Sequence, residues 1–108
     1  MSESSNKTKP SVRGQAYLLD KLTNQRYNLE NSVNKIGRDE SNAVYLMEDQ
    51  YVSRHHARVV LMQGKYYVED LESTNGTLYN GEDLVERKLL KPGDCITIGK
   101  TELVFMLE

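Results

Sequence analysis

Short apolar runs, each followed closely by a turn signal, constrain most strongly what this chain can fold into. From Gln15 onward these runs are rich in Val, Ile, Leu and Tyr, and Gly or Asn stands between most of them. Runs of this kind favour β-strands joined by tight turns. The runs that we expect to form strands are 16–20, 26–29, 35–37, 43–46, 57–62, 65–70, 77–79, 95–98 and 102–106. We therefore predict an all-β fold, a small β sandwich of two twisted, mostly antiparallel sheets.

Four turn signals and one ambiguous segment refine this prediction. The expected turns are Thr23-Asn24, Gln63-Gly64, Asn80-Gly81 and Gly99-Lys100. In 65–70, side-chain alternation places Tyr66 and Val68 on one face of the strand. The segment 82–90 is the best helix candidate, but two strand segments fit it as well, because Pro92-Gly93 soon ends it. We expect Cys95, in an alternating run, to be a small core residue.

The composition limits the functional classes. A length of 108 residues predicts one domain over 15–108, preceded by a polar segment over 1–14 that we expect to be a disordered tail. The net charge of −2 provides no basic surface for non-specific nucleic-acid binding. A single cysteine excludes an intrachain disulfide and a Cys-based zinc site, which favours a reducing, cytoplasmic location. No apolar stretch predicts a membrane span, and we expect a monomer.

Two short motifs and one earlier dipeptide carry the distinctive chemistry. They are Gly37-Arg38, the run 53–56 (Ser-Arg-His-His) and the run 73–77 (Ser-Thr-Asn-Gly-Thr), mostly at the ends of predicted strands. An arginine can hold two phosphate oxygens at once, and hydroxyl and amide groups can satisfy the remaining ones. This set suits a phosphorylated residue bound on a rigid β scaffold.

The order Gly-Arg, Ser-Arg-x-His, Ser-x-Asn-Gly-Thr and Asn-Gly resembles the forkhead-associated (FHA) domain family, whose members bind phosphothreonine peptides. The resemblance extends from about residue 15 to residue 106. It implies that Arg38 and Ser53 bind the phosphate, with Arg54 assisting, and that Thr74 touches the phosphothreonine. It also implies that the Asn75 carboxamide holds the peptide backbone.

The resemblance further implies supporting roles. Gly37 allows close backbone approach, Gly76 permits a positive φ at its turn, and His56 braces the loop that carries Ser53. Tyr51 stands where the family often selects the residue three positions after the phosphothreonine, and its ring suggests an apolar or mixed preference. We expect His55 to be exposed on the other face of the strand.

These inferences predict an interaction module with no enzymatic activity, no cofactor and no metal, whose partner is a threonine-phosphorylated protein. Two alternatives remain: a scaffold that binds partners without phosphate, and a small hydrolase that uses Ser53 and His56. The sequence contains no Gly-x-Ser-x-Gly nucleophile elbow, which counts against the hydrolase alternative. The run 99–101 (Gly-Lys-Thr) resembles the end of a P-loop, but the preceding glycine spacing is wrong and no helix is expected to follow. A phosphorylated Thr8 would be a tethered self-ligand, but we expect the tail to be inert.

Overall fold

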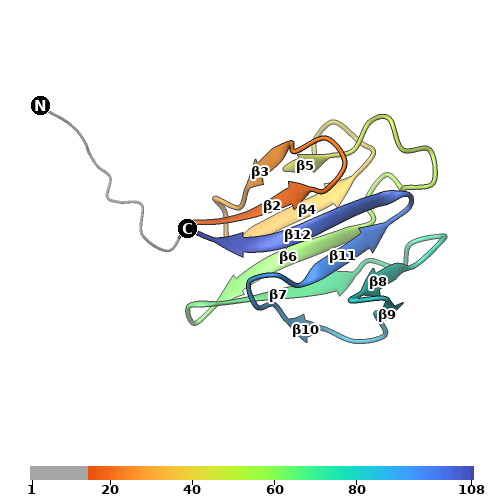
Figure 1. Cartoon of the computed structure of the whole chain (residues 1–108). Helices are drawn as coiled ribbons and strands as arrows, with labels where there is room; N and C mark the ends of the chain where they lie inside the picture. Colours follow the sequence, from red (N-terminus) through yellow and green to blue (C-terminus); the bar gives the residue numbers. More distant parts are fainter. Residues whose placement is uncertain (1–14) are drawn as a thin grey trace, which may run out of the picture.

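The computed structural model describes residues 15–108, which form two packed β-sheets and contain no helix, and hence none that is long and apolar enough to span a membrane (Figure 1). The five-stranded sheet has the order β10-β7-β6-β4-β5. Its strands are β4 (Val33–Gly37), β5 (Val44–Tyr45), β6 (Ala57–Met62), β7 (Lys65–Asp70) and β10 (Lys88–Leu89). The predicted all-β sandwich is confirmed; the predicted tail and Thr8 lie outside the described residues.

The six-stranded sheet has the order β3-β2-β12-β11-β8-β9. Its strands are β2 (Ala16–Asp20), β3 (Arg26–Asn28), β8 (Thr77–Tyr79), β9 (Glu82–Asp83), β11 (Cys95–Ile98) and β12 (Thr101–Leu107). Adjacent strands pair antiparallel in both sheets except β4 and β5, which are parallel. All four predicted turns contain a positive φ angle, at Asn24, Gln63-Gly64, Asn80-Gly81 and Gly99; the glycines and asparagines favour it, whereas Gln63 does not.

The core lies between the sheets and follows from side-chain alternation along the strands. In β7, Val68 is fully buried, and Tyr66 from the same face packs on Phe105 with ring centroids 5.4 Å apart. In β11, Ile96 and Ile98 are fully buried. Cys95 lies on the opposite face of that strand and is only half-buried, so its predicted core position is wrong.

Strand register brings several loops to one end of the sandwich. Ile36 pairs with Ala57, and Ala57 pairs with Asp70, so the chain leaves β4, enters β6 and leaves β7 at the same end. Thr77 pairs with Ile98, which brings the turn between β11 and β12 to that end as well. The predicted candidate residues therefore meet although they come from separate parts of the chain.

Two local predictions are corrected or decided by the structure. Strand β6 begins at Ala57, so His55 lies in the preceding loop and not on a strand face, as do Ser53, Arg54 and His56. The ambiguous segment 82–90 forms the two short strands β9 and β10 and no helix. The pairing of β10 with β7 and of β9 with β8 decides this, because each short strand gains a neighbour in a different sheet.

Candidate functional site

Three loops form the candidate site: 38–43 after β4, 46–56 before β6 and 71–76 after β7. The first two are joined by backbone hydrogen bonds, from Arg38 N to Ser53 O (3.0 Å) and from Asp39 N to Arg54 O (3.2 Å). The Arg38 side chain is exposed, and its Nε donates to Val52 O at 2.9 Å. Its Nη1 and Nη2 groups make no hydrogen bond within residues 15–108, which leaves a planar two-donor edge for a ligand.

Gly37 makes this close joining possible. A Cβ at position 37 would lie 2.0 Å from the carbonyl oxygen of Arg54 and 2.7 Å from Nδ2 of Asn42. Only a residue without a side chain fits between these two groups. The glycine therefore sets how closely Arg38 approaches the loop that carries Ser53.

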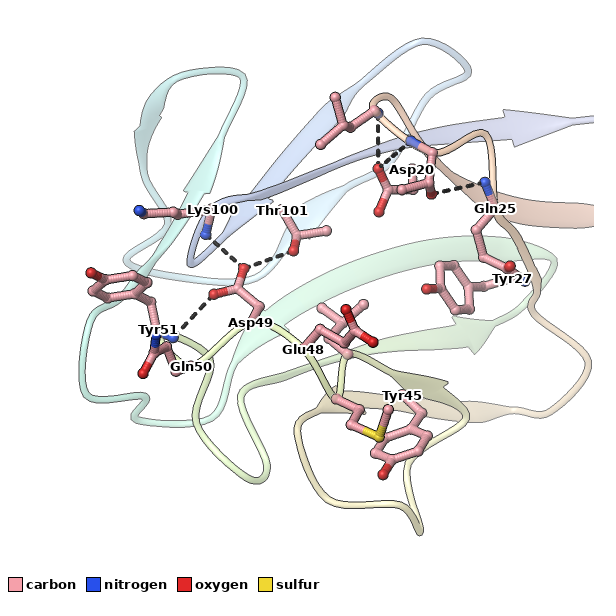
Figure 2. Close-up of a pocket in the computed structure, with 14 residues that line it drawn as sticks. Asp20, Gln25, Tyr27, Tyr45, Glu48, Asp49, Gln50, Tyr51, Lys100 and Thr101 are labelled. Carbon is pink, nitrogen blue, oxygen red and sulfur yellow. Dashed lines mark hydrogen bonds between the residues drawn. The ribbon is translucent and has the colours of Figure 1, made fainter.

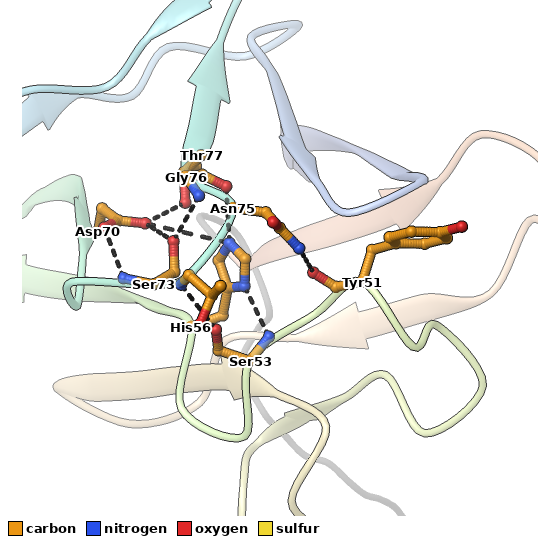
Figure 3. Close-up of polar contacts among 9 residues, drawn as sticks. Tyr51, Ser53, His56, Asp70, Ser73, Asn75, Gly76 and Thr77 are labelled. Atoms are coloured by element: carbon orange, nitrogen blue, oxygen red, sulfur yellow. Dashed lines mark hydrogen bonds and ion pairs between the residues drawn. The ribbon is translucent and has the colours of Figure 1, made fainter.

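His56 joins the second loop to the third from inside the fold (Figure 3). Its side chain is fully buried; Ser53 N donates to Nδ1 at 3.0 Å, and Nε2 lies 2.8 Å from Gly76 O. Because Nδ1 accepts a hydrogen bond, the Nε2 nitrogen carries the proton and donates to Gly76 O. One imidazole thus holds a backbone N–H of one loop and a carbonyl of the other.

The outer surfaces of the same two loops are also joined. Thr74 N donates to Oγ of Ser53 at 3.0 Å, and Nδ2 of Asn75 donates to Tyr51 O at 2.9 Å. Since the Ser53 oxygen accepts, its own hydroxyl proton remains available to a ligand. The Ser53 backbone N–H donates to Nδ1 of His56 and is therefore not available to a ligand.

The sequence reasoning missed Asp70, which organises the third loop (Figure 3). Its carboxylate accepts hydrogen bonds from Ser73 N (3.0 Å), Ser73 Oγ (2.6 Å) and Thr77 Oγ1 (2.6 Å). Partial burial alone would raise the pKa of Asp70, but these hydrogen bonds outweigh burial and hold it below its ordinary value. An Asp three residues before a Ser, at the end of a strand, is the sequence signal for such a turn.

Asn42 is a second residue that was missed. Its side chain is buried, and Nδ2 donates to Asp39 O (2.8 Å) and to Arg54 O (2.7 Å). Its Oδ1 lies 3.3 Å from Nδ1 of His55, whose ring is exposed as expected. Nothing in the sequence around Asn42 indicates partners so far along the chain.

Arg54 adds a second guanidinium to the surface. Its side chain is 73% exposed, and Nη2 lies 3.4 Å from Oδ1 of Asp39. Hydrogen bonds from the Ser41 side chain and backbone are the main reason that the pKa of Asp39 falls to about 2, with Arg54 contributing less. Asp39 is therefore ionised at neutral pH, and its exposed pair with Arg54 is weak enough for a phosphate to compete with it.

A small hollow lies beside Asn75. Tyr51, Asn75, Leu78 and Lys100 are among its lining residues, and its volume is about 290 Å³. The Lys100 ammonium lies 4.8 Å from the centroid of the Tyr51 ring, a cation–π contact. A ligand that enters here meets an aromatic edge, an aliphatic side chain and one positive charge.

The arrangement does not form a hydrolytic dyad. Oγ of Ser53 accepts from Thr74 N, whereas both ring nitrogens of His56 are engaged with backbone groups. The nearest described carboxylate, Asp70, lies 4.0 Å from Nε2 of His56, the nitrogen that donates to Gly76 O. A general base must reach the hydroxyl that it deprotonates, and His56 is used as a brace instead. Residues 15–108 also hold no cluster of three or more His, Cys, Asp or Glu suited to a metal.

Comparison with known proteins gives a consistent result. The family model described as "FHA domain" matches residues 34–99. The chain is 38% identical over 81 residues to the glycogen accumulation regulator GarA of Mycolicibacterium smegmatis, which covers 75% of this chain and 50% of that protein. It is 35% identical over 92 residues to the transcriptional regulatory protein EmbR of Mycobacterium tuberculosis, covering 85% of this chain and 24% of EmbR. The chain therefore spans half or less of the length of these curated relatives.

Two solved structures are close in shape. Mycobacterium tuberculosis EmbR in complex with a low-affinity phosphopeptide has a TM-score of 0.83 and 34% identity, over 88% of this chain and 25% of that chain. The FhaA FHA domain, complexed with the intracellular domain of Rv3910, has a TM-score of 0.77 and 31% identity, over 83% of this chain and 98% of that chain.

Proposed function

The chain belongs to the FHA domain family, and we propose that it binds threonine-phosphorylated proteins through the three loops 38–43, 46–56 and 71–76. Its relative EmbR has been solved with a phosphopeptide in place. The partner of this chain would then be the product of a Ser/Thr kinase. Because such a kinase uses ATP, we place the interaction in the cytoplasm.

The observation that carries the proposal is the joining of the loops around Ser53. Arg38 N donates to Ser53 O, and Ser53 Oγ accepts from Thr74 N, so three candidate residues are adjacent on one surface. Arg38 offers its two guanidinium NH2 groups, Ser53 offers its hydroxyl proton, and exposed Arg54 supplies a second positive charge. These donors match the oxygens of a phosphate group, which accept strong charge-assisted hydrogen bonds.

Thr74 and Asn75 recognise the rest of the ligand in this proposal. Both side chains are exposed at the start of the turn that ends at Gly76, whose φ of 81° favours glycine. One N–H of the Asn75 amide is used on Tyr51 O, which fixes the plane of the carboxamide. Its Oδ1 and second N–H remain for a peptide N–H and C=O. Tyr51, beside the small hollow, influences which residue follows the phosphothreonine.

We further propose that the domain is a binding module without catalytic activity, cofactor or metal. The absence of a hydrogen bond between Ser53 Oγ and His56 supports this over the hydrolase alternative. Both groups already have structural partners. A reaction at Ser53 would require His56 to release the backbone N–H that holds the loop.

Titration with four matched peptides tests the proposal. The peptides carry phosphothreonine, threonine, phosphoserine or aspartate at one position of a sequence selected from a phosphothreonine library. We expect measurable binding only with phosphate, and tighter binding of phosphothreonine than of phosphoserine. The γ-methyl contributes about 0.8 kcal/mol by burial, roughly fourfold in affinity, and more in a shaped pocket. Equal binding of phosphorylated and unphosphorylated peptides would instead support a phosphate-independent scaffold.

A further inference from the structure

A second and larger groove lies next to the loop site, between the edge strands β3 and β5 of the two sheets (Figure 2). Tyr27 of β3 and Tyr45 of β5 both line it, and its volume is about 680 Å³. The turn between β2 and β3, the first part (46–51) of the site loop 46–56 and the turn between β11 and β12 complete its walls. None of the residues proposed above to contact phosphate lines this groove.

Exposed apolar side chains are concentrated in its walls. The exposed fractions of Leu22, Met47, Tyr51 and Tyr45 are 91%, 56%, 48% and 38%, and all four residues line the groove. A contiguous apolar surface on a small domain usually marks a binding site, whereas single exposed apolar residues do not. The groove therefore needs an explanation that isolated residues such as Val85 do not need.

Hydrogen bonds hold these walls in place. Oδ1 of Asp49 accepts from Tyr51 N (3.0 Å), and Oδ2 accepts from Lys100 N and Thr101 Oγ1 (both 2.7 Å) (Figure 2). Burial alone would raise the pKa of Asp49, but these hydrogen bonds keep it below its ordinary value. Oδ1 of Asp20 accepts from Leu22 N (2.9 Å) in the opposite wall. The apolar side chains are thus presented by braced loops, which lowers the entropy cost of binding.

The charge of the groove favours a basic ligand. Three carboxylates line it, those of Asp20, Glu48 and Asp49, against the single ammonium of Lys100. Within residues 15–108 Glu48 forms no ion pair, and its side chain is exposed. A Lys or Arg of the ligand would therefore find a partner at the rim while an aliphatic neighbour occupies the apolar wall.

The groove is continuous with the proposed phosphopeptide site. Tyr51 and Lys100 line both the groove and the small hollow beside Asn75. We propose that the groove binds a second segment of the same phosphorylated partner, consisting of an aliphatic side chain flanked by a Lys or Arg. This inference rests on the proposed function, because the phosphothreonine supplies the anchor that makes the second contact intramolecular.

A peptide-extension experiment tests this. The best short phosphothreonine peptide is compared with peptides that carry an added Lys-Leu-Lys segment on a Gly-Ser linker of graded length, at either end. We expect one end and one range of linker lengths to bind about tenfold more tightly than the short peptide. A Glu-Leu-Glu segment on the same linker should lose this gain, and added salt should reduce it.

Variants locate the second contact. Leu22→Ser and Tyr45→Ser should abolish the gain while leaving the affinity for the short peptide unchanged, because both side chains are exposed and neither residue belongs to the three loops proposed to bind the phosphopeptide. Val85→Ser and Met62→Ser are matched controls, since these residues are also exposed (89% and 39%) but do not line the groove. Both controls should keep the full gain.

Three results would overturn the proposal while short-peptide binding stands. One is the absence of any gain at every linker length, or a gain that survives Leu22→Ser and Tyr45→Ser. Another is a gain seen only after Lys7, Lys9 and Arg13 are changed to Ala, which would assign the groove to the protein's own N-terminal segment. The third is concentration-dependent dimerisation lost in Leu22→Ser, which would assign it to a second copy. Failure of the short peptide itself would instead count against the proposed function.

Discussion

Two layers of residues at the loop end differ sharply in their surroundings. The proposed contact residues, Arg38, Ser53, Arg54, Thr74 and Asn75, are exposed or half-buried. The bracing residues beneath them, Gly37, Asn42, His56 and Asp70, are buried or largely so. The side chains of Asn42, His56 and Asp70 are each hydrogen-bonded to a backbone atom of a loop, at 2.7, 2.8 and 3.0 Å respectively.

The difference separates two physical tasks. A group that binds an anion needs free donors, which solvent satisfies until the ligand arrives. A group that shapes a loop must instead be buried with its own hydrogen bonds satisfied, since an unpaired buried polar group costs about 1–3 kcal/mol. Changes in the bracing layer should therefore lower both stability and binding, whereas changes of the exposed Arg38 or Arg54 side chains should lower mainly binding.

Gly37→Ala should produce the largest effect and tests the bracing layer most directly. The new Cβ would lie 2.0 Å from Arg54 O, so the backbone of β4 or of the Ser53 loop must move. We expect a loss of about 3 kcal/mol in the free energy of unfolding, at the upper end for overpacking, and loss of phosphopeptide binding. Gly64→Ala is the control: an alanine is strained at the φ of 78° found there, but no atom lies within 4 Å of the added Cβ. Denaturant titration measures the free energy of unfolding of both variants. Equal losses of this free energy in the two variants would contradict the packing explanation.

His56→Ala should lower the free energy of unfolding by about 2–3 kcal/mol, because Ser53 N and Gly76 O lose their shared partner and a cavity remains. Binding should weaken as well, since the two loops are then joined only at their outer surface. His55→Ala, at the exposed neighbouring position, should change stability little. Thermal melts and peptide titrations measure both quantities. An unchanged melting temperature would show that His56 is not a brace.

Arg38→Ala should weaken phosphopeptide binding by about 10- to 150-fold, which corresponds to roughly 1.5–3 kcal/mol for a hydrogen bond to a charged group. Stability should change by only about 0.5 kcal/mol, because the side chain is exposed. Arg38→Lys should restore part of the affinity, since an ammonium lacks the two-donor fork. Arg87→Ala, which removes an exposed arginine next to β10, is the control. Unchanged calorimetric titration of the Ala variant would remove Arg38 from the contact layer.

The smallest expected effect is the pH dependence due to Asp70. Its pKa is lowered in the folded state, so its stabilising contribution is complete above the ordinary value of 3.8 and is lost as pH falls through the folded-state value. The free energy of unfolding of the unmodified protein should therefore fall below about pH 4, and Asp70→Asn should fall less steeply there. Denaturant curves at a series of acidic pH values measure both slopes. Identical slopes would mean that the Asp70 carboxylate does not stabilise the loop.

Much of the fold and part of the site followed from local sequence patterns. Nine of the eleven strands in residues 15–108 overlap the runs expected to form strands, and the turn at Asn80-Gly81 adopts the positive φ angles typical of that pair. The proposed contact residues were predicted from the order of several motifs that together resemble the FHA family, because a single arginine or hydroxyl group beside a strand end is not distinctive. Cys95 was misplaced although alternation in its run puts the two isoleucines, Ile96 and Ile98, on one face and Cys95 with Thr97 on the other.

The bracing layer depends on tertiary structure. Asn42 reaches Arg54, His56 reaches Gly76, and Asp49 reaches Lys100, across 12, 20 and 51 positions of the chain. Hydrophobic periodicity and turn propensity act over a few residues, so a sequence alone determines which segments are strands and where the chain turns. Which polar side chain is buried under which loop depends on sheet order and strand register, because these bring distant segments within hydrogen-bonding distance. For the same reason, the groove between β3 and β5 exists only after the two sheets have packed.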